Sequence, residues 1–314
     1  MKILVTGGAG FIASHIVDSY VVSGHDVVII DDLSTGREEN INQKATFYRM
    51  DIRDNGAEEI FKKERPEVVN HHAAQMDVRR SVEDPRFDAS VNIIGTLNLL
   101  ENCIRYDVQR FIFASTGGAI YGEQEYFPAD EGHPERPLSP YGISKLACER
   151  YLFYYKMIHR LEYVTLRYSN VYGPRQNPHG EAGVVAIFTE KMLRGEQPVI
   201  NGDGCQTRDF LYIGDVVEAN KHAISASEGG TFNIGTAIET DINGLFRRLV
   251  DLTGSECREI HDPPKEGEQM RSVIDWKKAK GTLGWRPVVS LEEGLRETVM
   301  WFKRSTTNKL KIDD

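Results

Sequence analysis

The N-terminal residues contain the pattern that most constrains the fold of this chain. Residues 3–5 form an unbroken apolar run, which is typical of a strand buried on both faces of a sheet. Gly7, Gly8 and Gly10 follow, and Ala13 stands three residues after Gly10. Such spacing predicts a tight turn whose backbone can approach a pyrophosphate, followed by a helix from about Gly10 whose amides point at the phosphates.

A second apolar run, residues 27–30, ends at two acids, Asp31 and Asp32. An acid about 20 residues beyond the glycines typically binds the ribose hydroxyls and repels a 2′-phosphate. We therefore expect NAD rather than NADP as the cofactor, with Asp31 as the ribose ligand. A glycine turn in an ordinary βαβ unit is the alternative, but strand, turn, helix, strand and acid all occur in the expected order.

Further strands alternate with helices along the chain. Residues 68–70, 111–113 and 164–167 are expected as the third, fourth and next strands, and residues 91–103 and 141–160 as helices. This alternation predicts an α/β fold, a Rossmann-type doubly wound parallel sheet with a smaller C-terminal α/β substrate domain. In that last part, Ser290-Leu-Glu-Glu293 has the spacing of a capping box before a helix to Phe302.

Tyr141 and Lys145 stand four residues apart at the start of the predicted helix 141–160. Ser139 can cap this helix and Pro140 suits its first position, so the tyrosine and lysine share one face. A nearby ammonium favours the tyrosinate and lowers the tyrosine pKa, which would let Tyr141 take a proton from a substrate hydroxyl. Lys145 could also bind the nicotinamide ribose. A surface pair at helical spacing is the alternative, and the preceding glycine turn argues against it.

Composition excludes several functional classes. The net charge of −9 gives no electrostatic reason to expect nucleic acid as a partner. The sequence shows neither a signal peptide nor an apolar run long enough to cross a membrane. His71 and His72 are adjacent on a predicted strand and should face opposite ways, so we expect no metal site. The four cysteines lack metal spacing and predict buried thiols in the cytoplasm: Cys103, Cys148, Cys205 and Cys257.

Together these motifs resemble the extended short-chain dehydrogenase/reductase family, and within it the UDP-glucose (UDP-galactose) 4-epimerases. The resemblance covers nearly the whole chain and includes Thr6-Gly-Gly-Ala-Gly-Phe-Ile12, Asn92-Ile-Ile-Gly-Thr96, Leu166-Arg-Tyr-Ser-Asn-Val-Tyr-Gly-Pro-Arg175 and Leu283-Gly-Trp-Arg-Pro287. Sugar-nucleotide dehydratases, decarboxylases and other epimerases share most of these motifs. The resemblance implies an NAD-binding domain of residues 1–167 plus about 211–236, and a UDP-sugar domain of residues 168–210 and 237–314. It also implies a homodimer through helices 91–103 and 141–160.

The resemblance implies a set of binding residues in addition to the acid/base pair. The expected cofactor contacts are Gly7, Gly10, Phe11, Ile12, Asp31, Asp32, Leu33, Ser34, Thr35, Gly36, Asp51, Ile52, Ala73, Ala74, Gln75, Asn92, Tyr141, Lys145 and Tyr168. A solvated turn is the alternative for residues 34–36. The expected substrate contacts are Asn170, Val184, Val185, Asn201, Gln206, Arg208 and Arg271, with surface salt bridges as the alternative for the two arginines.

The segment Ser115-Thr116-Gly117-Gly118 departs from the pattern of the epimerases it resembles. Many of them carry a Ser or Thr at the position of Gly117. We expect Thr116 to supply the catalytic hydroxyl, with Ser115 as the second candidate. Dehydratases place an acid after the threonine, and the glycines here argue against dehydration as the reaction.

The resemblance implies interconversion of UDP-glucose and UDP-galactose by hydride transfer at carbon 4 to tightly bound NAD. Ser272 occupies a position where a bulky residue excludes N-acetyl groups, so UDP-N-acetylhexosamines are expected as further substrates. Three alternatives stay open. They are UDP-glucuronate 4-epimerisation or decarboxylation, for which Arg79, Arg80 and Arg175 could bind the carboxylate, a dehydrogenase that releases NADH, and a non-catalytic NAD-binding regulatory protein.

Overall fold

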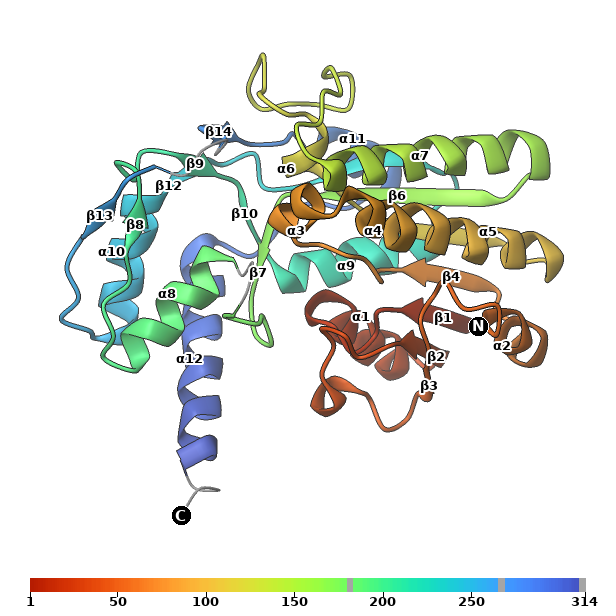
Figure 1. The fold of residues 1–314 in the computed structure, drawn as a ribbon, viewed down its shortest axis with the longest axis horizontal. Helices are drawn as coiled ribbons and strands as arrows, with labels where there is room; N and C mark the ends of the chain where they lie inside the picture. The colour runs from red at the N-terminus through yellow and green to blue at the C-terminus, as the bar shows by residue number, and fades with distance from the viewer. Residues whose placement is uncertain (180–182, 265–268, 311–314) are drawn as a thin grey trace.

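A seven-stranded parallel sheet forms the larger part of the molecule (Figure 1). This computed structural model describes residues 1–179, 183–264 and 269–310. The strand order is β11-β6-β5-β4-β1-β2-β3, and every neighbouring pair is parallel. The strands are β1 (Lys2–Thr6), β2 (Asp26–Asp31), β3 (Thr46–Arg49), β4 (Val68–His71), β5 (Arg110–Thr116), β6 (Glu162–Tyr168) and β11 (Gly230–Ile234).

Alternate strand residues face two separate hydrophobic cores, one on each side of the sheet. Ile3 and Val5 pack against α1 (Phe11–Val22), α9 (Ile213–Ile224) and α11 (Lys277–Leu283). Leu4 faces the opposite core, with α2 (Ala57–Glu64), α5 (Gly95–Arg105) and α7 (Pro140–His159). Because the period of a strand is two residues, an unbroken apolar run is what a sheet covered on both faces requires. The predicted α/β Rossmann-type sheet is therefore confirmed.

The smaller part of the chain gathers three helices around a third core (Figure 1). These helices are α8 (Val184–Leu193), α10 (Ile242–Thr253) and α12 (Leu291–Leu310). Short strands connect this part to the sheet: β7 (Asn170–Tyr172) with β10 (Phe210–Tyr212), β9 (Thr207–Arg208) between β12 (Thr240–Asp241) and β14 (Arg271–Ser272), and β8 (Ile200–Asn201) with β13 (His261–Asp262). Strand β11 returns to the large sheet beside β6, as the implied crossover requires.

Two predictions about the elements need correction. Residues 68–70 belong to the fourth strand, because β3 precedes them at the edge of the sheet. The helix expected over residues 91–103 begins earlier, as α4 (Pro85–Ala89), continues through a π-helical segment η2 (Ser90–Ile94), and ends as α5. The capping box is confirmed, since Ser290 N–H donates to Glu293 and Glu293 N–H donates to Ser290 Oγ. The remaining elements are η1 (Glu38–Asn40), α3 (Val78–Glu83) and α6 (Gly117–Ile120).

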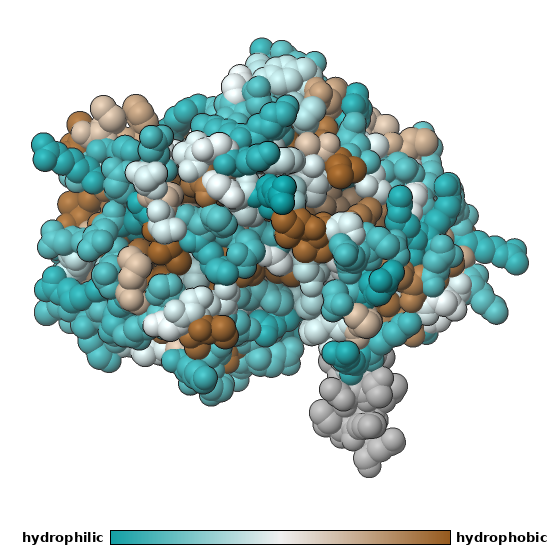
Figure 2. All heavy atoms as spheres, turned by 180° about the vertical axis from the view of Figure 1, so that it is seen from behind, coloured by the Kyte–Doolittle hydropathy of each residue, from teal (hydrophilic) through white to brown (hydrophobic). Residues whose placement is uncertain are grey.

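The face of the molecule opposite to that of Figure 1 is mostly polar (Figure 2), in keeping with the charged residues of the sequence. Seen from behind, it is mostly hydrophilic, with separate hydrophobic patches between polar regions (Figure 2). Within the described residues, no helix combines the length and the hydropathy that a membrane span needs.

Candidate active site

The glycine turn brings the end of β1 against the loop that follows β4. Gly7 has a φ of +70°, and a Cβ placed there would lie 2.7 Å from the backbone nitrogen of Ala73. Gly10 is the N-cap of α1 and makes no side-chain cap, and the first turn of this helix holds no acid. The first amides of a helix lack partners within it, so those of Phe11 and Ile12 are suited to an anionic ligand.

Asp31 ends β2 and orders the loops on both sides of it. Its carboxylate accepts hydrogen bonds from Ala9 N–H (2.9 Å) and Leu33 N–H (2.8 Å). The side chain is buried, and burial raises its pKa. A Cβ on Gly36 would lie 2.8 Å from Asp31 Oδ1, so the loop also approaches the carboxylate closely. The arrangement holds Asp31 where it can accept a further hydrogen bond from a ribose hydroxyl.

The other predicted adenosine contacts lie around this loop. Asp32 is exposed and accepts the Ser34 N–H at 2.8 Å, and Ser34 and Thr35 are exposed. The Asp51 carboxylate is paired with Arg53, whose guanidinium lowers its pKa. Ile52 is buried and packs beneath Gly95, at the start of α5. These side chains surround the carboxyl ends of β2 and β3, and the Asp51 carboxylate already has a cationic partner.

The loop after β4 is held by a reciprocal pair of hydrogen bonds. Gln75 N–H donates to Asn92 Oδ1, and Asn92 Nδ2 donates to the Gln75 carbonyl, both at 2.9 Å. The Gln75 side chain turns inward and donates to the Asp77 carbonyl and to Asp88. The amides of Gln75 and Asn92 therefore fix the loop that carries Ala73 and Ala74, and the cofactor contacts expected of these two residues stay predictions.

Tyr141 and Lys145 lie on one face of α7, as expected. Ser139 Oγ accepts the Gly142 N–H, which begins the helix at Pro140. Lys145 Nζ donates to the Ala114 carbonyl at 2.9 Å, near the end of β5, and lies 5.9 Å from the centre of the Tyr141 ring. The lysine is only 4% exposed, and burial lowers its pKa to about 8. The pair therefore combines a tyrosine hydroxyl with a cation largely removed from water.

The two candidate hydroxyls face opposite ways on β5. Ser115 is buried, and its Oγ donates to Glu149 Oε1 at 2.6 Å. Glu149 is in turn paired with the buried Arg167. The hydrogen bond of Ser115 therefore joins a buried ionic cluster, and its role as the second candidate for the catalytic hydroxyl stays a prediction. Thr116 caps α6 by accepting Ala119 N–H at 3.2 Å and is only half-buried.

Ser272 lies near this threonine, and both hydroxyls face Gly118. A Cβ on Gly118 would lie 3.8 Å from Ser272 Oγ and 3.9 Å from Thr116 Oγ1. Strand β14 pairs with β9 so that Ser272 stands opposite Arg208. The structure therefore brings the predicted proton-relay residue, the predicted hexose gate and one predicted diphosphate ligand into one region.

Three of the predicted substrate contacts, Arg271, Arg208 and Gln206, have hydrogen-bond or ionic partners within the chain. Arg271 pairs with Glu239 and lies 3.6 Å from the centre of the Phe127 ring, so its guanidinium is engaged. Arg208 Nη1 donates to the Thr207 carbonyl. The Gln206 amide is buried and donates to the Asn201 carbonyl. Asn170 is exposed and begins β7, whereas Val184 and Val185 begin α8.

Tyr168 has a different environment from the one expected. It is buried, and its hydroxyl accepts from Asn220 Nδ2 at 2.8 Å and contacts His72 Nε2 at 3.1 Å. Burial raises the pKa of the tyrosine far above its usual range. The hydroxyl of Tyr168 is therefore engaged within the protein, and the cofactor contact expected of this residue stays a prediction.

Sequence reasoning missed a contact between α1 and residues 174–177, which we name the clasp. His15 Nε2 donates to the Pro174 carbonyl at 2.9 Å. Arg175 pairs with Asp18 at 2.8 Å and donates to Ser14 Oγ. A further hydrogen bond joins Arg37, just after the adenosine loop, to Asn177. The clasp therefore bonds the segment after β7 to the helix that follows the glycine turn, and no local sequence pattern signals it.

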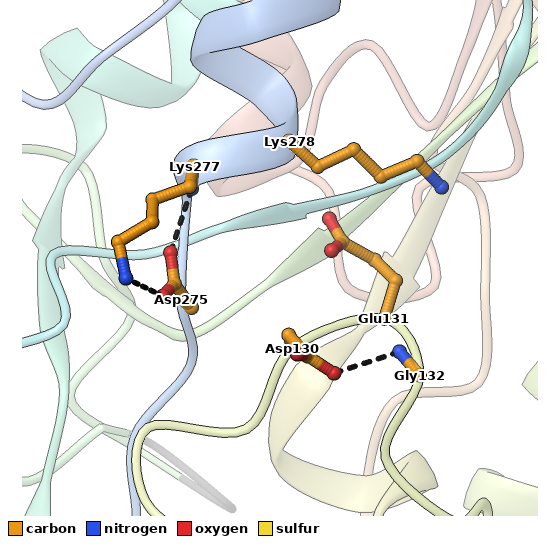
Figure 3. Close-up of a pocket in the computed structure, with 6 residues that line it drawn as sticks. All are labelled: Asp130, Glu131, Gly132, Asp275, Lys277 and Lys278. Carbon is orange, nitrogen blue, oxygen red and sulfur yellow. Dashed lines mark hydrogen bonds and ion pairs between the residues drawn. The ribbon is translucent and has the colours of Figure 1, made fainter.

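A cavity of about 500 Å³ lies apart from these residues (Figure 3). Its lining is charged, with Asp130 and Glu131 facing the start of α11, where Lys277 is paired with Asp275. None of the predicted site residues lines it. The chemistry indicated by Tyr141 and Lys145 therefore does not belong to this cavity.

Comparison with known proteins identifies the family. Residues 3–235 match the model of the NAD dependent epimerase/dehydratase family. The chain belongs to this family. A UDP-glucose 4-epimerase from Thermotoga maritima, solved with UDP-glucose, is 51% identical to this chain with a TM-score of 0.96. The match covers 98% of this chain and 100% of the Thermotoga chain. One from Thermus thermophilus, solved with NAD, is 46% identical with a TM-score of 0.91 (96% and 99%). A UDP-N-acetylglucosamine 4-epimerase from Methanobrevibacter ruminantium, in complex with UDP-N-acetylmuramic acid, is 36% identical with a TM-score of 0.92 (97% and 98%).

The residues of this chain fit NAD, the cofactor for which the family is named. A Cβ at Gly7 would fill the closest approach of the turn to Ala73. The amides at the start of α1 lie beside the turn, and Asp31 presents a buried carboxylate at the end of β2. A pyrophosphate and a ribose diol are complementary to these groups, so the prediction of NAD as the cofactor is confirmed.

Proposed function

We propose that this chain is a UDP-sugar 4-epimerase that interconverts UDP-glucose and UDP-galactose while NAD stays bound. The observation that carries the proposal is the buried Lys145 ammonium beside the Tyr141 ring, at the carboxyl edge of the sheet. In an open α/β sheet, ligands bind outside this edge. A tyrosine made acidic by a neighbouring cation suits proton abstraction from a sugar hydroxyl near neutral pH.

Each of three side chains has one role in the proposed reaction. Tyr141, as the phenolate, takes the proton from the hydroxyl at carbon 4 and later returns it to the same oxygen, when hydride adds to the opposite face of carbon 4. Lys145 favours the phenolate by its charge. Thr116 donates a hydrogen bond to the sugar oxygen as negative charge develops there. When bound, NAD supplies the acceptor and the donor for the hydride of carbon 4.

The geometry above supports a proposed set of residues that would hold NAD. The amides of Phe11 and Ile12 and the turn at Gly7 and Gly10 suit the pyrophosphate, and Asp31 suits the adenosine ribose. The surrounding loops complete the set through Asp32, Leu33, Ser34, Thr35, Gly36, Asp51, Ile52, Ala73, Ala74 and the backbone of Tyr168. The nucleotide of the substrate is assigned to Asn170, Val184, Val185, Asn201, Gln206, Arg208 and Arg271, and residues 1–167 with about 211–236 are the NAD-binding domain.

A second substrate class, the UDP-N-acetylhexosamines, is favoured by Ser272. This serine is small, and Gly118 opposite it has no side chain, so the space beside Thr116 is not filled by a bulky residue. Ser272→Tyr should remove activity on UDP-N-acetylglucosamine and leave activity on UDP-galactose. Equal loss of both activities would contradict the assignment of Ser272 as the gate.

Two alternative reactions are less well supported by the site. A dehydratase needs an acid after the threonine, and Gly117 and Gly118 stand there. UDP-glucuronate chemistry needs a cation at the carbon 6 carboxylate, but Arg175 is engaged with Asp18 in the clasp and Arg80 lies over the Phe87 ring. The placement of Tyr141 and Lys145 beside the NAD cradle favours catalysis over a regulatory role.

The enzyme is further proposed to be a homodimer of the cytoplasm. Helix α7 exposes large apolar side chains at Ile143, Tyr151, Phe153, Tyr154, Met157 and Ile158. Ile94, at the end of η2, is also exposed. Apolar surface of this extent on one helix marks a protein interface. A reducing compartment suits the four free cysteines. Light scattering should give twice the mass of the chain, and Phe153→Glu should give the monomer.

The function is tested with purified protein and a panel of nucleotide sugars, without added cofactor. The panel contains UDP-galactose, UDP-N-acetylglucosamine, UDP-glucuronate and dTDP-glucose, and products are separated by chromatography. We expect UDP-glucose from UDP-galactose with no net accumulation of NADH. Accumulating NADH would instead identify a dehydrogenase. Tyr141→Phe should abolish turnover and keep UDP-sugar binding in calorimetry, whereas a protein with no product from any substrate would support the regulatory alternative.

A further inference from the structure

Asp88 is a fully buried carboxylate at the centre of a polar network beside the site. Gln75 Nε2 and Asn92 Nδ2 donate to its Oδ1 at 3.1 and 3.0 Å. Ser144 Oγ donates to its Oδ2 at 2.5 Å. One carboxylate thus receives hydrogen bonds from the loop after β4, from the π-helical segment and from α7. Burying a carboxylate is costly unless such donors compensate it, so this position is under strong structural constraint.

Asp88 of α4 and Asn92 of the π-helical segment η2 both hydrogen-bond to Gln75 in the loop after β4. Four residues separate them along the continuous helix from α4 to η2. The widened turn leaves the Asn92 carbonyl to accept from Thr96 Oγ1 at 2.6 Å and from Cys148 Sγ at 3.2 Å. The helix distortion therefore has partners on α5 and α7, and it fixes Asp88 between the loop and α7.

The position of Ser144 connects Asp88 to the chemistry. Ser144 directly precedes Lys145 and lies in the same helical turn as Tyr141. We propose that Asp88 is a positioning residue for the proposed epimerase reaction, which locks the Tyr141–Lys145 turn of α7 against the loop that carries Ala73 and Ala74. The negative charge of Asp88 also favours the charged form of Lys145, and it comes from outside α7, the helix that carries the lysine.

The charges around Lys145 show why that second role matters. Burial lowers the pKa of Lys145 to about 8, and Cys148, Asp88 and Glu149 oppose this effect. Glu149 is already paired with Arg167, which screens part of its charge. Tyr141 on its own helix, His71 at the end of β4 and the adjacent His72 also face the lysine, and the pKa of both histidines is lowered by burial first and by the charge of the lysine second. The side chains of Gln75, Asn92 and Ser144, which donate to Asp88, are all neutral and leave its negative charge in place.

The test compares three variants with the wild-type enzyme. Asp88→Asn removes the charge with little change of volume, and its amide cannot accept all three hydrogen bonds. Ser144→Ala keeps the charge and removes one hydrogen bond. Glu83→Gln removes an exposed negative charge at the end of α3, five residues before Asp88 in the sequence, and serves as the matched control. For each protein, kcat and KM are measured from about pH 6 to pH 10, together with the melting temperature and the NAD content after acid release.

For Asp88→Asn we expect kcat to fall about tenfold or more, with a smaller change of KM, because the acid/base turn is misplaced. Removing a negative charge lowers the pKa of every nearby group, so both limbs of the pH profile should move to lower pH by about half a unit or more. Ser144→Ala should lower kcat without moving the limbs, and Glu83→Gln should match the wild type.

Four results would overturn the inference. Two concern Asp88→Asn: a wild-type kcat and pH profile, or a reduced kcat with limbs of the pH profile that do not move. The third is a pH profile of Glu83→Gln whose limbs move as far as those of Asp88→Asn. The fourth applies where Asp88→Asn does not fold, and it is a wild-type kcat in Ser144→Ala. The inference rests on the proposed function, and the wild-type assay separates the two, because a wild-type protein without turnover contradicts the function and leaves no rate to compare.

Discussion

Substituting Gly7 by alanine tests the close approach at the centre of the NAD cradle. Gly7 has a φ of +70°, and a left-handed conformation costs a residue with a Cβ about 1–2 kcal/mol. The new Cβ would also lie 2.7 and 2.9 Å from the backbone nitrogen and Cα of Ala73, and overpacking of this kind costs about 1–3 kcal/mol. We expect Gly7→Ala to lower the free energy of unfolding by about 2–5 kcal/mol.

Gly24 provides a matched control in the same βαβ unit. Its φ is +81°, and a Cβ there would meet nothing within 4 Å, so only the backbone cost of about 1–2 kcal/mol applies. Urea unfolding of both variants, followed by circular dichroism, gives the difference. Because relief of the contact displaces Ala73, Gly7→Ala should also lose NAD during purification, whereas Gly24→Ala should retain it. Equal destabilisation of the two variants, with NAD retained in both, would refute the close-approach argument.

Three further predictions concern the site. Thr116→Val should lower kcat about 10²-fold with little change of KM, whereas Ser115→Ala should chiefly lower the melting temperature. The reverse pattern in kinetics and calorimetry would identify Ser115 as the catalytic hydroxyl. Arg175→Ala should speed NAD release, measured as loss of bound nucleotide during dialysis, because the helix that follows the glycine turn loses the bonds of Asp18 and Ser14 to the clasp. Unchanged retention would show that the clasp does not help to hold the cofactor. The pKa of about 8 for Lys145 predicts that kcat falls as the pH rises through 8, because the lysine loses the charge that favours the tyrosinate, and a kcat constant to about pH 10 would contradict this.

The buried part of the sheet could be predicted because its signals are local. Apolar runs such as residues 27–30 must lie between two layers of helices, and the glycines after β1 require special backbone angles. Strand β3 was missed because it lies at the sheet edge and only half-buries its residues. The early start of α4 did have a local signal, since Asp84 caps it and Pro85 occupies its first turn.

The features of the site that the sequence does not show depend on contacts between distant parts of the chain. The choice between Ser115 and Thr116 depends on which strand face meets Glu149, and that carboxylate comes from a helix distant in the sequence. The π-helical segment depends in the same way on Cys148 and Gln75. Such tertiary partners leave no spacing in the sequence, whereas the Tyr141–Lys145 pair is visible because both residues lie on one helix.

The fate of the hydrogen at carbon 4 tests the central claim most directly. UDP-galactose carrying deuterium at carbon 4 is incubated with the purified protein in ordinary water, without added cofactor, and the product is analysed by mass spectrometry and NMR. The account predicts UDP-glucose that retains the deuterium at carbon 4, because hydride leaves and returns within one site while Tyr141 moves only the hydroxyl proton. Deuterium lost to solvent, or product formed at an undiminished rate by Tyr141→Phe, would contradict it.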